Sequence, residues 1–265
     1  MSGNSAFEMV SERGWRRGLG NLLNNEFAHW WKTKMWWIQC LIWVSLIGLM
    51  LGAVLFGSPD DKPKLIDVVM LYAIFAGLFP AVGVVIIMQD ALVGEKRDGT
   101  AAWVLSKPAA RPAFILSKLI ANSLGVLATM VVLPGIVVYG MLSLGIKASL
   151  NPWFFLAAMG IIFLNHLFYL TLTLMLGSFF NSRGPVIGIA LALIFLQQYV
   201  IALLPVLRYL LPWTLVIPLN NQTEAIVPAL LSGQPIYSYI PIVAMVVESI
   251  LFVLICLWRF NREEF

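Results

Sequence analysis

The sequence predicts an all-α membrane protein in which residues 1–265 form a single transmembrane domain of six spans. Of its 265 residues, 60% are hydrophobic and 11% are charged, whereas soluble domains contain about 25% charged residues. Several apolar runs also reach the length of about 20 residues that crosses a bilayer core of about 30 Å. No secretory signal peptide is expected, because the polar first thirty residues precede no short apolar core with a cleavage site.

The spans are placed by apolar runs and by the turn signals between them. The second run contains Pro80, which should kink it, and the long third run contains Pro134 and Gly135, which predict a break. The short polar link at 181–184 predicts an antiparallel hairpin. The predicted spans are residues 36–56, 67–88, 113–143, 153–180, 185–205 and 237–258.

Residues 206–236 are too rich in proline and too interrupted for an ordinary span, yet too apolar for a free loop. Irregular backbone at membrane depth is tolerated where protein buries it. We therefore predict a re-entrant segment at the outer face, between the fifth and sixth spans.

Residues 1–35 form a predicted cytoplasmic segment that contains an amphipathic helix. Apolar and aromatic side chains recur there at helical spacing, and polar side chains take the other face. Such a helix lies against membrane lipid before the first span and makes an elbow. A flanking anchor and an elbow that contacts a partner protein both remain open. Its apolar residues are Leu19, Leu22, Leu23, Phe27, Trp30 and Trp31.

Orientation follows from the cations, since short loops rich in Lys and Arg stay in the cytoplasm. Of the 17 Lys and Arg residues, all but four fall on one side when the termini share that side. We therefore predict a multi-pass protein of the plasma (inner) membrane, with a cytoplasmic N-terminus and a cytoplasmic tail at 259–265. The basic balance reflects this topology and not nucleic-acid binding. The four exceptions are Lys62, Lys64, Lys147 and Arg208.

Residues 90–112 form a strongly charged segment between the second and third spans. Glu95 and Arg97 precede Gly99 and Thr100, and a short apolar run follows. Thr100 could cap a small helix over 101–105 by accepting a backbone N–H, and Pro108 would end the helix. The segment could transmit force from a soluble partner, or it could be only a basic loop that obeys the orientation rule.

The local pattern resembles the coupling region of ABC-2 type transporter permeases. The resemblance implies a type V exporter-like architecture, with a cytoplasmic coupling helix between spans 2 and 3. It also implies a dimer of two permease copies, identical or related, that binds two ABC ATPase subunits and exports a drug, lipid, peptide or similar amphiphile. The residues that carry the pattern are Glu95, Gly99, Thr100, Leu105, Ser106, Pro108, Arg111 and Lys118.

No phosphate-binding GxxxxGK[ST] loop occurs, because nowhere in the sequence does Lys directly follow Gly. We therefore expect no enzymatic activity and no cofactor in this chain. ATP and Mg²⁺ would belong to the partner ATPase.

Glu248 is the one acidic residue well inside a predicted span, where a carboxylate is costly. Polar groups of the fourth span, Asn165 and His166 among them, could meet it. A hydrogen-bonded contact between helices, a substrate or gating role and a proton relay all remain open. No metal site is expected, because neither His has neighbours at ligand spacing.

Two other classes of protein stay as alternatives. A secondary transporter would usually show inverted repeats around midplane ligands, and no convincing repeat is visible. A membrane scaffold or anchor would give no ATPase stimulation on reconstitution.

Overall fold

The computed structural model describes residues 14–57, 63–145, 150–219 and 225–263. Six helices in these ranges are long and apolar enough to cross a membrane, which confirms the predicted number of spans. The spans are α2 (Met35–Phe56), α3 (Leu65–Met88), the continuous α6–α7 unit, α8 (Pro152–Phe179), α9 (Arg183–Leu203) and α12 (Ile240–Asn261).

The last span begins and ends about three residues later than the sequence predicts. Pro241 lies in the first turn of α12, where a missing N–H costs nothing, and this favours a start at Ile240 over Tyr237. The helix continues to Asn261, so the first residues of the predicted tail belong to α12.

The proline predicted to kink the second span and the proline predicted to break the third both lie within continuous helix. Pro80 lies inside α3. Ahead of Pro134, α6 (Arg111–Val126) passes through the π-helical turn η2 (Leu127–Val132) into α7 (Leu133–Gly145). A proline cannot bond to the carbonyl four residues earlier, and a π turn changes the register of the bonds locally. The predicted break is therefore a wide turn.

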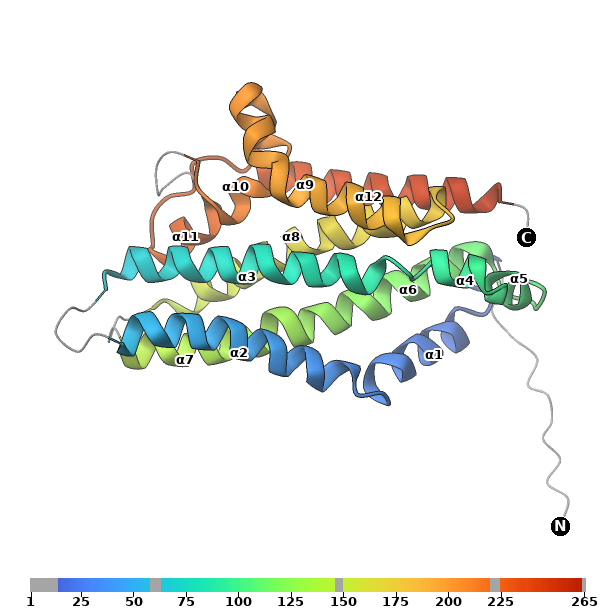
Figure 1. The fold of residues 1–265 in the computed structure, drawn as a ribbon, viewed down its shortest axis with the longest axis horizontal. Helices are drawn as coiled ribbons and strands as arrows, with labels where there is room; N and C mark the ends of the chain where they lie inside the picture. Colours follow the sequence, from blue (N-terminus) through green and yellow to red (C-terminus); the bar gives the residue numbers. More distant parts are fainter. Residues whose placement is uncertain (1–13, 58–62, 146–149, 220–224, 264–265) are drawn as a thin grey trace, which may run out of the picture.

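The spans pack around α8, which contacts α3, α6, α9 and α12. Of its most apolar stretch, 61% is buried inside the protein, against 22% for α2 and for α12. The outer spans present their remaining apolar surface to lipid. Helix α2 packs against α3 and α7 along the lower edge of the bundle in Figure 1.

Short elements gather at one end of the bundle, the right-hand end in Figure 1. They are α1 (Leu19–Trp31), α4 (Val93–Arg97) and α5 (Thr100–Leu105), beside the α8–α9 link and the end of α12. The start of the described chain, η1 (Gly14–Arg16), packs on α6. The two ends of the described part of the chain, Gly14 and Glu263, thus share one end of the bundle, as an even number of spans requires.

The opposite end carries η3 (Pro205–Tyr209), α10 (Trp213–Val216) and α11 (Ile226–Leu231). Both α10 and α11 fold back onto α3 and α8. Val216 packs directly on Gly77, where an added Cβ would lie 2.6 Å from a Val216 methyl carbon. Gly77 lies about 18 Å along α3 from Leu65, at 1.5 Å per residue. This contact therefore lies near the middle of the span.

Candidate functional site

The charged segment between α3 and α6 contains two short helices and not one. Gly99 separates α4 from α5 and has φ +72°, the left-handed conformation that glycine adopts without strain. An added Cβ there would meet nothing within 4 Å, so backbone conformation alone favours glycine at this position. The body and end of the predicted small helix agree with α5, which stops before Pro108.

Gly99→Ala is expected to destabilise this turn by about 1–2 kcal/mol, the cost of a left-handed conformation for an L-residue. Gly99→Asn is the matched control, because asparagine enters this conformation more readily. Thermal unfolding of the purified variants in detergent measures the difference. Equal unfolding temperatures for Ala and Asn would contradict the explanation.

Thr100 does not cap α5 as predicted. Gly99 occupies the N-cap position and no side chain caps the helix. The Thr100 hydroxyl instead donates to the Glu95 carboxylate and lies 3.2 Å from the Glu95 carbonyl oxygen. The capping prediction was wrong because it considered only the following N–H groups, whereas the turn at Gly99 places α4 behind Thr100.

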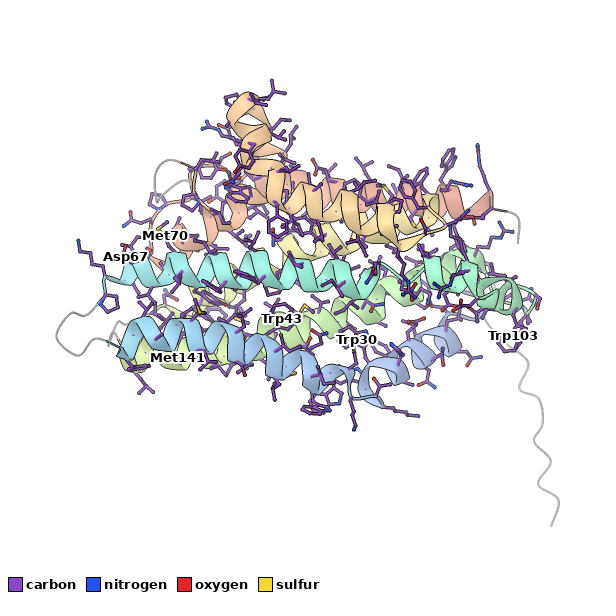
Figure 2. All side chains as sticks on the ribbon, in the orientation of Figure 1. Trp30, Trp43, Asp67, Met70, Trp103 and Met141 are labelled. Atoms are coloured by element: carbon purple, nitrogen blue, oxygen red, sulfur yellow. The ribbon has the colours of Figure 1, made fainter. Side chains whose placement is uncertain are left out.

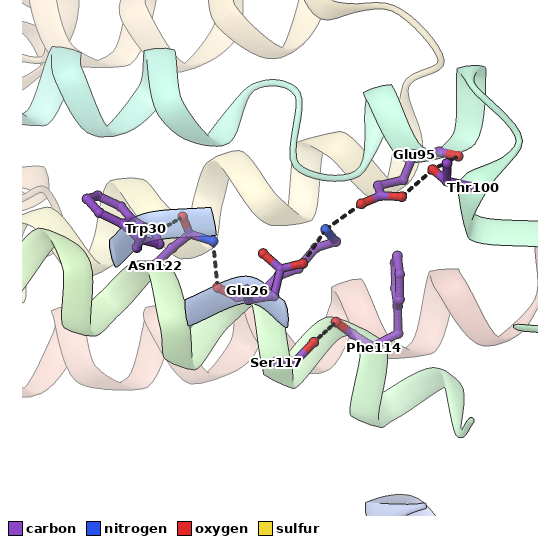
Figure 3. A network of polar contacts seen from close by, with 8 residues as sticks. Glu26, Trp30, Glu95, Thr100, Phe114, Ser117 and Asn122 are labelled. Carbon is purple, nitrogen blue, oxygen red and sulfur yellow. Dashed lines mark hydrogen bonds and ion pairs between the residues drawn. The ribbon is translucent and has the colours of Figure 1, made fainter. Parts of the chain in front are cut away.

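Lys118 of α6 joins this segment to the N-terminal helix. Its Nζ lies 2.8 Å from Glu95 Oε1 of α4 and 2.8 Å from Glu26 Oε1 of α1. Figure 3 shows the two carboxylates converging from the two helices. The Lys118 side chain is 5% exposed. A lysine this buried is stable only when paired, so it fixes the relative positions of α1, α4 and α6.

A second set of bonds continues from Lys118 toward the membrane interior. The Lys118 carbonyl accepts from Asn122 Nδ2 at 2.8 Å, and Asn122 Oδ1 accepts from the Trp30 indole at 3.0 Å. Trp30 is 1% exposed, and an added Cβ at Gly125 would lie 2.4 Å from its ring. Trp31, which follows it, is exposed.

The other predicted residues of the N-terminal helix, Leu19, Leu22, Leu23 and Phe27, are half-buried. Helix α1 packs along α6, so this face is shared between protein and surroundings. Glu26 lies on the same face, at helical spacing from Leu22 and Trp30. Sequence reasoning missed Glu26, although an acid on an apolar face was a visible signal.

Arg111 and Lys96 tie the same segment to the ends of α8 and α12. Arg111 Nη1 donates to the carbonyls of Asn261 and Glu263 at 2.7 and 2.8 Å, which satisfies free carbonyls at the end of α12. Lys96 Nζ lies 3.2 Å from the Ser178 carbonyl oxygen and 3.3 Å from Glu263 Oε1.

Asp90 completes the set of links by pairing with Arg183, the first residue of α9, whose Nε lies 2.6 Å from Asp90 Oδ1. We call these residues the end network. They are Glu26, Asp90, Glu95, Lys96, Thr100, Arg111, Lys118, Asn122, Arg183 and Glu263.

Several predicted residues of the charged segment, among them Arg97, Leu105 and Pro108, lie outside the end network. Arg97 pairs with its neighbour Asp98, and both side chains are more than half exposed, so the pair adds little stability. Leu105 packs partly against the core, and Pro108 is exposed.

Among the described residues no hydrogen bond joins Glu248 to Asn165 or His166. Asn165 Nδ2 donates to the Gly77 carbonyl of α3 at 2.9 Å and lies 3.5 Å from His166 Nδ1. Glu248 is half-buried on α12. The described residues contain no cluster of three His, Cys, Asp or Glu side chains that could hold a metal.

These features define a polytopic α-helical membrane protein whose short terminal helices are joined to its spans by ion pairs. The profile described as ABC-2 family transporter protein matches residues 20–265, and the chain belongs to this family. It is thus a permease-type membrane component of an ABC transporter. No curated protein matches the chain.

Proposed function

We propose that this chain is the membrane-spanning subunit of an exporter, and that α5 receives the movement of a separate ABC ATPase. The end network carries this proposal. Its ion pairs and hydrogen bonds join the α4–α5 segment to α1, α6, α8, α9 and α12. A displacement of α5 would therefore reach most of the bundle at once.

The same end of the bundle carries the cationic links assigned to the cytoplasm from the sequence. We propose that it faces the cytoplasm of the plasma (inner) membrane, where a soluble ATPase is available. Lys96, Arg97, Arg111, Arg183 and Arg262 support this orientation, because all five follow or precede spans at this end.

We further propose that two copies of the chain pair and that two ATPase subunits bind the pair. Helix α9 and the following turn expose a long row of apolar side chains, and η3 stands out from the bundle in Figure 1. In the pair this apolar, aromatic surface would line the space between the two copies. Such a lining suits an amphiphilic cargo such as a drug, lipid or peptide. The exposed residues are Ile189, Phe195, Leu196, Tyr199, Val200, Leu203, Leu204 and Val206.

Trp103 is the residue of α5 best suited to contact the ATPase. It is 62% exposed, and Lys107 Nζ lies 3.2 Å from the ring centroid. Figure 2 shows it at the tip of the bundle, at the end opposite Asp67 and Met70. Large exposed tryptophans are frequent anchors of protein interfaces.

Trp103→Ala is expected to weaken binding of the proposed ABC ATPase partner at least roughly tenfold. The measurement is titration of the purified ATPase against the chain in lipid nanodiscs, followed by ATPase stimulation. Trp153→Ala is the matched control, since Trp153 is 76% exposed at the opposite end. Equal affinities for the two variants would remove α5 from the interface.

Transport itself is tested in proteoliposomes that contain both proteins and a fluorescent amphiphile. ATP-dependent movement that requires both proteins supports the exporter. Full activity of the chain alone under an ion gradient would refute it in favour of a secondary transporter. A complex without ATPase stimulation would indicate a scaffold.

A further inference from the structure

Pro80 leaves a backbone carbonyl of α3 without its helical partner. In a regular helix the N–H of residue 80 would bond to the carbonyl of Ala76, and proline has no N–H. At this depth in a membrane no water compensates for the loss, so a neighbouring helix must supply a donor.

Two consecutive residues of α8 approach this turn. Asn165 Nδ2 donates to the Gly77 carbonyl and lies 3.5 Å from His166 Nδ1, and the His166 ring lies beside the backbone of Ala76. Both residues are buried, with exposures of 2% and 0%. His166 Nε2 is also buried and has no hydrogen-bond partner in the described part of the chain. An apolar residue would fill this space at lower cost, so packing alone does not explain the histidine.

The same turn of α3 is held by α10, and the part of α3 that follows it leads to the end network. Val216 of α10 rests on Gly77 in the turn itself. Beyond the turn, α3 leads within five residues of Met88 into α4, whose Glu95 belongs to the end network. Any movement of α4 relative to α10 must therefore be absorbed along α3.

We propose that the Ala76–Pro80 turn is a hinge in α3, and that Asn165 and His166 are positioning residues that set its resting angle. This inference rests on the proposed coupling of α4 and α5 to an ATPase. A turn that lacks one helical bond bends more easily than its neighbours. Asn165 bonds the Gly77 carbonyl, and His166 is placed to donate to the Ala76 carbonyl that Pro80 frees, so the hinge is soft without being unstable.

A double-mutant cycle tests the contact in the chain alone. Pro80→Ala restores an N–H for Ala76, so His166→Leu should destabilise the Pro80→Ala background less than the wild type. The expected difference is roughly 5–30-fold in the ratio of folded to unfolded protein. His166→Gln retains a hydrogen-bond donor and should therefore lose less stability than His166→Leu. The measurement is denaturant unfolding in detergent micelles.

Thr173→Val is the matched control for this cycle. Thr173 is fully buried on α8, and its hydroxyl donates to the Tyr169 carbonyl of its own helix at 2.7 Å. Thr173→Val should lower the free energy of unfolding by the same amount in the wild-type and the Pro80→Ala backgrounds. An equal cost of His166→Leu in both backgrounds would overturn the assignment of His166.

The hinge is tested by transport per ATP hydrolysed. Pro80→Ala should leave ATPase binding unchanged and lower transport per ATP at least roughly fivefold, since α3 becomes stiffer. Wild-type transport in Pro80→Ala would overturn the hinge. Failure of the wild-type chain to bind or stimulate any ATPase would refute the proposed function instead, and the unfolding cycle would stand apart from that result.

Discussion

Lys118→Met is expected to lower the free energy of unfolding by about 3–5 kcal/mol, the cost of removing one partner of a buried ion pair. The substitution keeps the length and apolar stem of the side chain but removes the charge that joins Glu26 to Glu95. Two carboxylates with exposures of 17% and 28% would then face each other unpaired. Denaturant unfolding in detergent, with transport in proteoliposomes, measures the effect.

We expect the Lys118→Met variant to insert and to bind the ATPase through α5, yet to transport poorly. The link between α1 and α4 would be lost while α5 remained in place. Arg97→Met is the control, because it removes a cation of the same segment whose pair with Asp98 is exposed. That change should leave the free energy of unfolding nearly unchanged, because water already solvates both partners of the pair. Equal losses in the two variants would show that the buried pairs have no special role.

Gly125→Ala is expected to destabilise the protein by about 1–3 kcal/mol, the usual cost of overpacking a close-packed site. Its added methyl would lie 2.4 Å from the Trp30 ring and would push α1 away from α6. The Trp30–Asn122 bond would break, and Trp30 would become accessible. Thermal unfolding and quenching of tryptophan fluorescence report the two consequences.

Gly140→Ala in α7 should instead stabilise the protein, because nothing lies within 4 Å of an added Cβ there. Alanine stabilises an open helical site by up to about 1 kcal/mol over glycine. A Gly125→Ala variant as stable as Gly140→Ala would show that α1 is not held by the Trp30 contact. The pair isolates close packing from helix propensity, since the chemical change is the same.

The order and number of the spans were readable from the sequence because the signal is local. A run such as 36–56 is apolar all round and long enough to cross a bilayer, whatever it later contacts. The charged segment was readable for the same reason. Gly99 and Pro108 mark a turn and a helix end through their own backbone chemistry.

The predicted helix limits were less accurate where contacts with a distant part of the chain decide where a helix ends. The last span was predicted from hydropathy, which does not separate Tyr237 from Ile240. The tertiary structure continues α12 to Asn261, where Arg111 satisfies its final carbonyls. Arg111 precedes Asn261 by 150 residues.

The partners of the site residues were decided only by the tertiary structure. Glu95 and Lys118 stood out in the sequence, but Glu26 did not, because it comes 92 residues before the lysine that it contacts. Asn165 was one of several possible partners of Glu248, and the structure bonds it to the Gly77 carbonyl of α3.

Trp30 and Trp31 show most clearly what the sequence could not predict. They are adjacent and identical, and the sequence placed both on one amphipathic face. The structure buries Trp30 against Gly125 and exposes Trp31. By itself the sequence determined the six spans and the charged segment between the second and third, since hydropathy, charge and turn chemistry act within a few residues. Only the tertiary structure decided which side chains meet, because packing and pairing join residues that periodicity along the chain does not relate.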